Sequence, residues 1–234
     1  MKMIEIRNLY FKYEEEFVLK NVDLKIKDGS FTAIIGANGS GKTTLAKHFN
    51  ALLTPTKGNI FVDGVDTKKD EANARKKIGF VFQNFEDQLI YSIVEEDIAF
   101  GLENLGLDSS KISKIVENTL DRLSLKHLAK RNVNTLSLGQ KQLVALAGVL
   151  AMKPEYIVFD EPTTMLDARN KKKIMNIIND VNKKDKITIM LITNILDDLK
   201  YASNIIILKG GNVIFYGEKS KLNKKLLAKA GLND

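Results

Sequence analysis

The residue types and spacing of residues 36–43 are those of a loop that binds phosphate. They read Gly-Ala-Asn-Gly-Ser-Gly-Lys-Thr, so that two glycines flank four residues and a lysine and a hydroxyl residue follow. Glycines let backbone N–H groups turn toward an anion, and a following helix adds partial positive charge from its N-terminus. Lys42 can then reach the β- and γ-phosphates of a nucleotide, and Thr43 can hold Mg²⁺. The residues of this segment expected to contact the nucleotide are Gly36, Asn38, Gly39, Ser40, Gly41, Lys42, Thr43 and Thr44.

The neighbouring sequence decides between a nucleotide loop and a glycine-rich turn that binds nothing. Residues 31–35 are an apolar run that predicts a buried strand, and the periodic residues 44–53 predict a helix. A strand before the loop and a helix after it are the context in which this pattern binds phosphate. We therefore favour the nucleotide loop.

Two carboxylates follow a second apolar run, residues 156–159, which predicts another buried strand. Strand ends present side chains at the sheet edge where ligands bind in open α/β folds. Asp160 is therefore placed to hold Mg²⁺ through water, and Glu161 is placed to polarise an attacking water. Taken alone, the pair could also be an ordinary acidic helix start. Gln83 follows the predicted strand 78–82, and its amide could touch both the metal and that water.

Composition and length indicate one globular chain with a substantial core. Of 234 residues, 44% are apolar and 28% are charged, and there is no cysteine to form a disulfide or bind a metal. We expect neither a membrane-spanning segment nor a signal peptide, and the cytoplasm is the simplest compartment. The net charge of +7 could suggest nucleic acid, but the lysines occur in small groups without interleaved aromatic residues. They are typical of solvated helix faces, and no nucleic-acid partner is expected.

Strands and helices alternate along most of the chain. Alternating apolar residues over 3–26 predict strands, and further strands are expected at 60–62, 187–192, 205–208 and 213–216. A helix is expected over 168–183, and residues 112–123 and 143–151 carry helical periodicity. Buried strands alternating with helices predict an α/β fold with a mainly parallel sheet. The helical middle, about 84–152, looks like an insertion into a core formed by about 1–83 and 153–217, with a short tail at 218–234.

One further motif makes the chain resemble a known family. Residues 136–140 read Leu-Ser-Leu-Gly-Gln, and Ser137 lies 23 residues before Asp160. This segment resembles the Leu-Ser-Gly-Gly-Gln signature of ATP-binding-cassette (ABC) ATPases. In the same order, Tyr13 resembles the aromatic residue that stacks on adenine, residues 36–43 Walker A, Gln83 the Q-loop, 157–161 Walker B and 165–167 the D-loop. The resemblance covers about residues 3–217 of the chain.

The resemblance implies a single ABC ATPase domain over 1–234. Its fold would be a P-loop NTPase core with a mainly parallel sheet, an antiparallel β subdomain at the N-terminus and an inserted helical subdomain. The expected activity is hydrolysis of ATP with Mg²⁺, held by Thr43, Gln83 and Asp160, with Glu161 catalytic. Two such chains pack head to tail, and each ATP lies between Walker A of one chain and the signature residues Ser137, Gly139 and Gln140 of the other.

A narrower resemblance is to the ATPases of energy-coupling-factor importers, which take up vitamins or transition-metal ions. It rests on residues 81–101, and on 139–142 continuing into 145–154. It implies that the chain lies at the cytoplasmic face of the cell membrane. There it would sit beneath a transmembrane scaffold protein that joins a separate substrate-binding membrane protein. Residues 84–101 are the expected docking surface. The apolar residues Phe85, Leu89, Ile90, Tyr91 and Ile93 would either line a groove for a partner helix or fill the helical subdomain's core.

Three positions depart from the family pattern. Leu138 replaces a signature glycine, where the backbone approaches the partner's γ-phosphate. Asn194 stands where the family has a histidine that contacts the γ-phosphate; its amide can donate a hydrogen bond but cannot become cationic. Neither His48, on the helix after Walker A, nor His127, which is expected in a loop, is an obvious substitute. Leu143 replaces a frequent arginine and is interpreted as packing. We expect slow hydrolysis that improves beside a second, non-identical ATPase, with near-normal hydrolysis in a homodimer as the alternative.

The sequence alone leaves other functions open. The chain could be a catalytically degenerate subunit, or the ATPase of a conventional ABC importer or exporter. Members that act on DNA or the ribosome usually carry tandem cassettes or long coiled coils, which are not seen here. After Gly217 only 17 residues follow, so the dimerising extension of many energy-coupling-factor ATPases is not expected.

Overall fold

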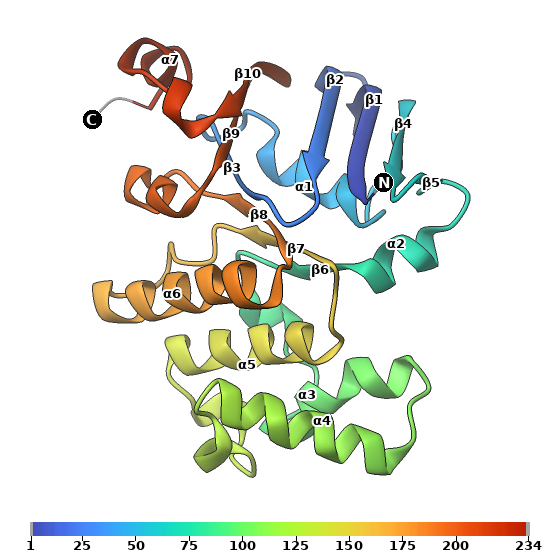
Figure 1. The fold of residues 1–234 in the computed structure, drawn as a ribbon, viewed down its shortest axis with the longest axis vertical. Coiled ribbons are helices and arrows are strands. Elements are labelled where there is room, and N and C mark those ends of the chain that lie inside the picture. Colours follow the sequence, from blue (N-terminus) through green and yellow to red (C-terminus); the bar gives the residue numbers. More distant parts are fainter. Residues whose placement is uncertain (1, 233–234) are drawn as a thin grey trace.

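A six-stranded sheet runs through the middle of the molecule in the computed structural model, which describes residues 2–232 (Figure 1). The strand order is β10-β9-β3-β8-β7-β6. Five strands are parallel to their neighbours, and β10 pairs with β9 in the antiparallel direction. The strands are β3 (Phe31–Ile35), β6 (Ile78–Val81), β7 (Tyr156–Asp160), β8 (Thr188–Ile192), β9 (Asn204–Lys209) and β10 (Asn212–Glu218). The predicted mainly parallel sheet is confirmed.

The central strands form because their apolar runs can be buried on both faces. Every residue of β3, β6, β7 and β8 is buried. Helices cover the two faces, which explains why these strands are continuously apolar rather than alternating. The result is a rigid sheet whose carboxyl-terminal edge can hold polar side chains in fixed positions.

A second, antiparallel sheet of four strands lies beside the first, in the order β2-β1-β4-β5. Its strands are β1 (Met3–Lys12), β2 (Phe17–Lys27), β4 (Lys57–Val62) and β5 (Val65–Asp66). Its apolar face packs on α1 (Lys42–Phe49), whose other side packs on the central sheet, so Leu9 and Phe49 share one core cluster with Met190. The expected antiparallel sheet at the N-terminus is present.

Half of the helices in residues 2–232 follow one another between β6 and β7 in the chain and lie together on one side of the central sheet (Figure 1). They are the 3₁₀ helix η1 (Phe85–Gln88), α3 (Val94–Asn104), α4 (Ser109–Arg122), η2 (Lys126–Leu128), η3 (Val133–Thr135) and α5 (Leu138–Ala151). The remaining elements are α2 (Glu71–Lys77), α6 (Ala168–Asp185), η4 (Leu196–Tyr201), η5 (Lys219–Lys221) and α7 (Lys224–Lys229). Leu143 is buried in this layer, as expected for a packing residue.

Some boundaries differ from the predictions for local reasons. The helix expected over 44–53 is α1, which begins at Lys42 and ends at Phe49 because the chain turns at Ala51, where φ is 56°. α6 extends beyond the expected 183 to Asp185 and ends at Lys186, whose backbone is left-handed. His127, expected in a loop, lies in η2. The short helices α2 and α7 have too few residues to show a clear period.

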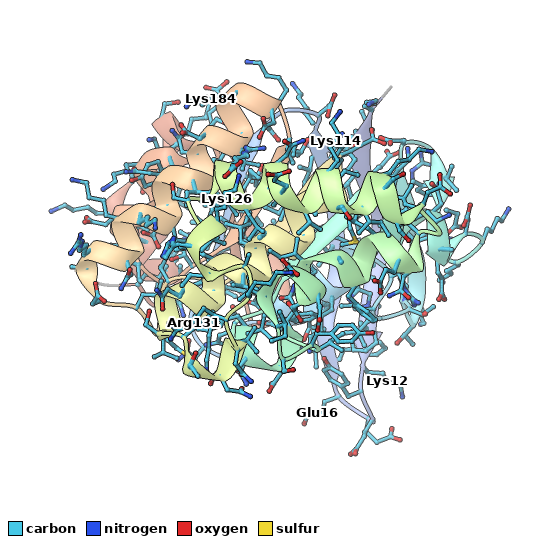
Figure 2. All side chains as sticks on the ribbon, turned by 90° about the horizontal axis from the view of Figure 1, so that it is seen from below. Lys12, Glu16, Lys114, Lys126, Arg131 and Lys184 are labelled. Carbon is cyan, nitrogen blue, oxygen red and sulfur yellow. The ribbon has the colours of Figure 1, made fainter. Side chains whose placement is uncertain are left out.

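Charged side chains are spread over the surface rather than gathered on one patch. In Figure 2, Lys114, Lys126, Arg131 and Lys184 lie apart on the helical side of the molecule. Several cations are paired, including Lys126 with Glu117 at 3.0 Å and Lys184 with Asp180 at 2.9 Å. Within residues 2–232, no helix is both long enough and apolar enough to cross a bilayer.

His48 makes the stability of the fold depend on pH. Its ring is fully buried, Nδ1 lies 2.7 Å from the Thr44 carbonyl oxygen, and burial lowers the pKa of His48 to about 4. The unfolded chain therefore binds a proton at His48 between about pH 6.5 and pH 4, while the folded chain does not. This contribution to stability is fully present above about pH 6.5 and is lost as the pH falls toward 4, by up to about 3 kcal/mol.

We expect His48→Gln to flatten the acid side of the stability curve. The measurement is the free energy of unfolding in urea at several pH values. His127→Gln is the matched control, because His127 is exposed. An unchanged pH slope in the His48 variant would show that His48 does not carry this dependence.

Candidate nucleotide site

The phosphate loop runs from β3 into α1, and its first glycine has no room for a side chain. Gly36 has φ of +153°, and a Cβ placed on it would lie 2.2 Å from the Leu208 carbonyl oxygen of the neighbouring strand. Gly41 caps α1 in a left-handed conformation and brings no side chain to the N–H groups of the first turn. Those donors can therefore bind an anion.

Lys42 lies inside the loop that it follows. Its ammonium donates to the carbonyl oxygens of Gly36, at 2.8 Å, and Ala37, at 3.1 Å. The side chain is buried, and this burial lowers the pKa of Lys42. The Ser40 hydroxyl is also buried and has no hydrogen-bond partner among residues 2–232. A buried cation and an unpaired hydroxyl inside a loop of glycines fit a phosphate ligand.

Thr43 and Asp160 meet although 117 positions separate them in the chain. The Thr43 hydroxyl donates to Asp160 Oδ1 at 3.0 Å. Asp160 ends β7 and is buried, and this burial raises the pKa of its carboxyl group. A hydroxyl and a buried carboxylate are hard oxygen ligands, so this pair could hold Mg²⁺.

The Glu161 carboxylate is held by side chains from two neighbouring strand ends. Gln83, after β6, donates to Oε2 at 3.1 Å, and Asn194, after β8, donates to Oε1 at 3.0 Å. Thr164 adds a longer bond of 3.4 Å to Oε2. The Glu161 backbone is left-handed, with φ of 47°, and its N–H donates to the Ile192 carbonyl oxygen. The predicted residues Gln83, Glu161 and Asn194 are thus brought together.

A pocket of about 380 Å³ connects these groups. It is lined by Val18, Asn38, Gly39, Gly41, Lys42, Thr43, Thr44, Gln83 and Glu161. Tyr13 lies on the neighbouring β hairpin, with its hydroxyl 3.4 Å from the Thr44 hydroxyl oxygen. The Tyr13 side chain is 60% exposed and meets Phe11 edge to face, so a ring face is open for stacking on a base.

The signature residues form a separate surface at the start of α5. Ser137 caps the helix, and its side chain and that of Gln140 bond reciprocally to each other's backbone N–H. Gly139 is buried, and a Cβ there would lie 2.8 Å from Asn170 Cγ. Leu138 is 46% exposed. Among residues 2–232, the pocket lining contains none of these residues, so one chain does not bring its two predicted nucleotide surfaces together.

The expected docking segment divides between core and surface. Phe85 is buried in the core, while Ile90 and Tyr91 are 60% and 42% exposed. Both of their N–H groups donate to Asp97 Oδ1, at 2.7 and 3.0 Å, and burial raises the pKa of Asp97. A groove of about 470 Å³ lies beside this segment, between α2, α3 and α5. The core alternative is confirmed for Phe85, and the docking alternative stays a prediction for the exposed Ile90 and Tyr91.

Sequence reasoning missed the contacts that connect the motifs. Lys141, next to the signature, pairs with Glu86 of η1. Gln142 donates to the carbonyl oxygen of Pro162, which follows Glu161. Asn194 also donates to Asn38 of the phosphate loop at 2.9 Å. No local pattern reveals such pairs, because their members are 20 to 156 positions apart.

Gly36 and Gly39 provide a matched test of the loop. Both have positive φ, but a Cβ at Gly39 would meet nothing within 4 Å. We expect Gly36→Ala to lower the free energy of unfolding by about 2 kcal/mol more than Gly39→Ala, and to weaken ATP binding more, because the added Cβ collides with a carbonyl oxygen. Urea unfolding and ATP titration measure both. Equal losses in the two variants would contradict this geometry.

The chain is similar in sequence to a known family of ATP-binding proteins. A model of the ABC transporter family matches residues 19–164. The chain is 43% identical over 241 residues to the energy-coupling factor transporter ATP-binding protein EcfA1 of Clostridium novyi, covering 99% of this chain and 86% of that one.

Two solved structures have the same fold. One is cbiO1 from Clostridium perfringens, described as part of the ABC transporter complex cbiONQ, with a TM-score of 0.86, 35% identity, and coverage of 99% of this chain and 95% of that one. The other is the dimeric ATP-binding cassette MJ0796 bound to ADP and phosphate, with a TM-score of 0.82, 33% identity, and coverage of 92% and 98%. The chain therefore belongs to the ABC family of transporter ATPases.

Proposed function

We propose that this chain hydrolyses ATP with Mg²⁺ as a motor subunit of an energy-coupling-factor importer, with Glu161 as the general base. One observation carries the proposal. The Glu161 carboxylate lines the same pocket as Lys42 and Thr43 and is oriented by Gln83 and Asn194. A carboxylate in this position can take a proton from water that attacks the γ-phosphate.

The roles of the residues follow from their positions. Lys42 and the N–H groups at the start of α1 bind the β- and γ-phosphates. Thr43 and Asp160 would hold Mg²⁺, with Gln83 as a further oxygen ligand, and the bound ion would neutralise charge on the phosphate oxygens. Glu161 accepts the proton of the attacking water, the new oxygen–phosphorus bond forms, and the bond to the bridging oxygen breaks to leave ADP and phosphate.

A complete site needs a second ATPase chain. Ser137, Gly139 and Gln140 lie on α5, outside the pocket that holds Lys42. A head-to-tail pair would bring the signature of one chain against the phosphate loop of the other, and the dimeric relative supports this arrangement. In such a pair the exposed Leu138 would face the γ-phosphate. A homodimer would contain two such sites, and a heterodimer would let an intact partner supply a glycine at one of them.

The membrane partners are proposed from the relatives and the groove. The EcfA1 and cbiO1 relatives support an energy-coupling-factor transporter over a conventional importer or exporter. The chain would then sit at the cytoplasmic face of the membrane, below a scaffold protein joined to a binding protein for a metal ion or vitamin. The groove beside Ile90 and Phe100 is suited to an apolar helix of that scaffold. Gln83 lines the nucleotide pocket and lies only seven positions before Ile90, which lines the groove. This short segment therefore links the proposed docking groove to the nucleotide site.

Glu161→Gln tests the proposed function. The amide cannot accept the proton of water, so we expect this variant to bind ATP and stay dimeric with it. Gel filtration with light scattering and labelled ATP measures both. Lys42→Met is the paired variant, expected to lose nucleotide and remain monomeric. A Glu161→Gln chain that binds no ATP, or that hydrolyses it at the unmodified rate, would contradict the proposal.

A second experiment tests the two departures from the family pattern. We expect the Leu138→Gly, Asn194→His double variant to release phosphate roughly 10²-fold faster than the unmodified chain, because both changes restore contacts near the γ-phosphate. Leu52→Gly, at an exposed leucine outside the site, is the control for added glycine. Equal turnover in the double variant and the unmodified chain would mean that both departures are tolerated.

A further inference from the structure

The side chain of Asn194 joins the phosphate loop to the catalytic carboxylate. Its Nδ2 donates to Glu161 Oε1 at 3.0 Å and to Asn38 Oδ1 at 2.9 Å. An ionised carboxylate only accepts hydrogen bonds, so the amide nitrogen must face Glu161. The Asn38 oxygen accepts the second N–H, which favours the same orientation of the Asn194 amide.

This arrangement uses both N–H groups of Asn194. Its Oδ1 is buried and has no partner among residues 2–232. A buried unpaired oxygen costs free energy, so the two donated bonds must offset that cost. No N–H of Asn194 is left for a γ-phosphate contact while both bonds are made. In this geometry, Asn194 acts on Glu161.

We propose that Asn38 and Asn194 form an amide clamp that positions Glu161 for proton transfer. The clamp is these two side chains. Gln83 donates to Glu161 Oε2 at 3.1 Å, and the clamp holds Oε1, the carboxylate oxygen that Gln83 does not contact. The inference rests on the proposed function, since it assigns Glu161 as the base. Asn38 and Asn194 are positioning residues, because they act through Glu161.

Asn38 contributes by restraining the Asn194 amide. Without its oxygen, one N–H of Asn194 loses its acceptor, and the amide can rotate toward other partners. The Asn38 side chain comes from the phosphate loop, in which the neighbouring Gly39 has left-handed backbone geometry. Movement of the loop is therefore transmitted directly to the orientation of Glu161.

The clamp requires hydrogen-bond donors at position 194. An ionised carboxylate only accepts hydrogen bonds, so the Asn194 amide can hold Glu161 only through its N–H groups. Asn194→Asp is nearly isosteric but replaces these donors with acceptors. The change should therefore remove the hold on Glu161 while keeping the shape of the side chain.

The first test is steady-state phosphate release with five variants. We expect Asn194→Ala to lower kcat by about 10- to 100-fold with KM for ATP nearly unchanged, and Asn38→Ala to lower kcat by a smaller factor. The Asn38→Ala, Asn194→Ala double variant should be no slower than Asn194→Ala alone, because both changes break one clamp. Asn194→Asp should lower kcat about as much as Asn194→Ala, because an acceptor replaces the N–H donors that hold Glu161. Asn176→Ala, at an exposed asparagine of α6, is the control and should be unchanged.

Two results would overturn the clamp. They are a loss in KM rather than kcat for Asn194→Ala, and fully additive effects of Asn38→Ala and Asn194→Ala on kcat. Each would mean that Asn194 does not act through Glu161. Binding of a fluorescent ATP analogue to every variant separates a loss of nucleotide binding from a loss of positioning.

A second measurement keeps the clamp testable if the unmodified chain shows no turnover, in which case the proposed function fails on its own. The side-chain amide signals of Asn194 in a ¹⁵N-labelled, nucleotide-free chain are assigned by their absence in Asn194→Asp. Glu161→Gln and Asn38→Ala should each shift these signals, while Asn176→Ala should not. Signals that stay in place in both variants would rule out the contacts.

Discussion

The parallel pairing of β7 between β6 and β8 is the constraint on which the site depends. Asp160 is opposite Ile192, and Phe159 is opposite Val81, so the three strands end at one edge of the sheet. The residues that follow these strand ends, Gln83, Glu161 and Asn194, can therefore reach one another. β3 pairs with β8 on the other side and delivers the phosphate loop to the same edge. A shift in any of these registers would separate the carboxylate from the loop.

The site stores unfavourable interactions that a ligand would relieve. Burial lowers the pKa of Lys42 and raises that of Asp160, so both charged forms are destabilised relative to water. Glu161 is held in a left-handed conformation that is rare for its residue type. Phosphate would stabilise the charge on Lys42, and a divalent cation would stabilise that on Asp160. This is the physical reason to expect tight, cooperative binding of the two.

Much of the fold could be predicted because it is encoded locally. The apolar runs of the buried strands and the glycine spacing of the loop depend on nearby residues. The predicted strands and helices are confirmed in type, with ends shifted by a few positions. The short helices α2 and α7 gave too little periodicity to detect. The contacts of Asn38 with Asn194, and of Lys141 with Glu86, depend on long-range packing and are invisible to a local pattern. For Asn194, the resemblance to the family suggested a phosphate contact, whereas the structure places its amide against Glu161.

In the proposed mechanism, two chains complete the site and Glu161 acts as its base. The most direct test of this mechanism is the rate of phosphate release from Mg-ATP by the purified chain and its Glu161→Gln variant over a range of chain concentrations. We predict that the rate per unmodified chain rises with concentration toward a plateau, because pairing limits it, and that the variant releases no phosphate above background at any concentration. A rate per chain that is independent of concentration, or equal rates in the two proteins, would contradict the account.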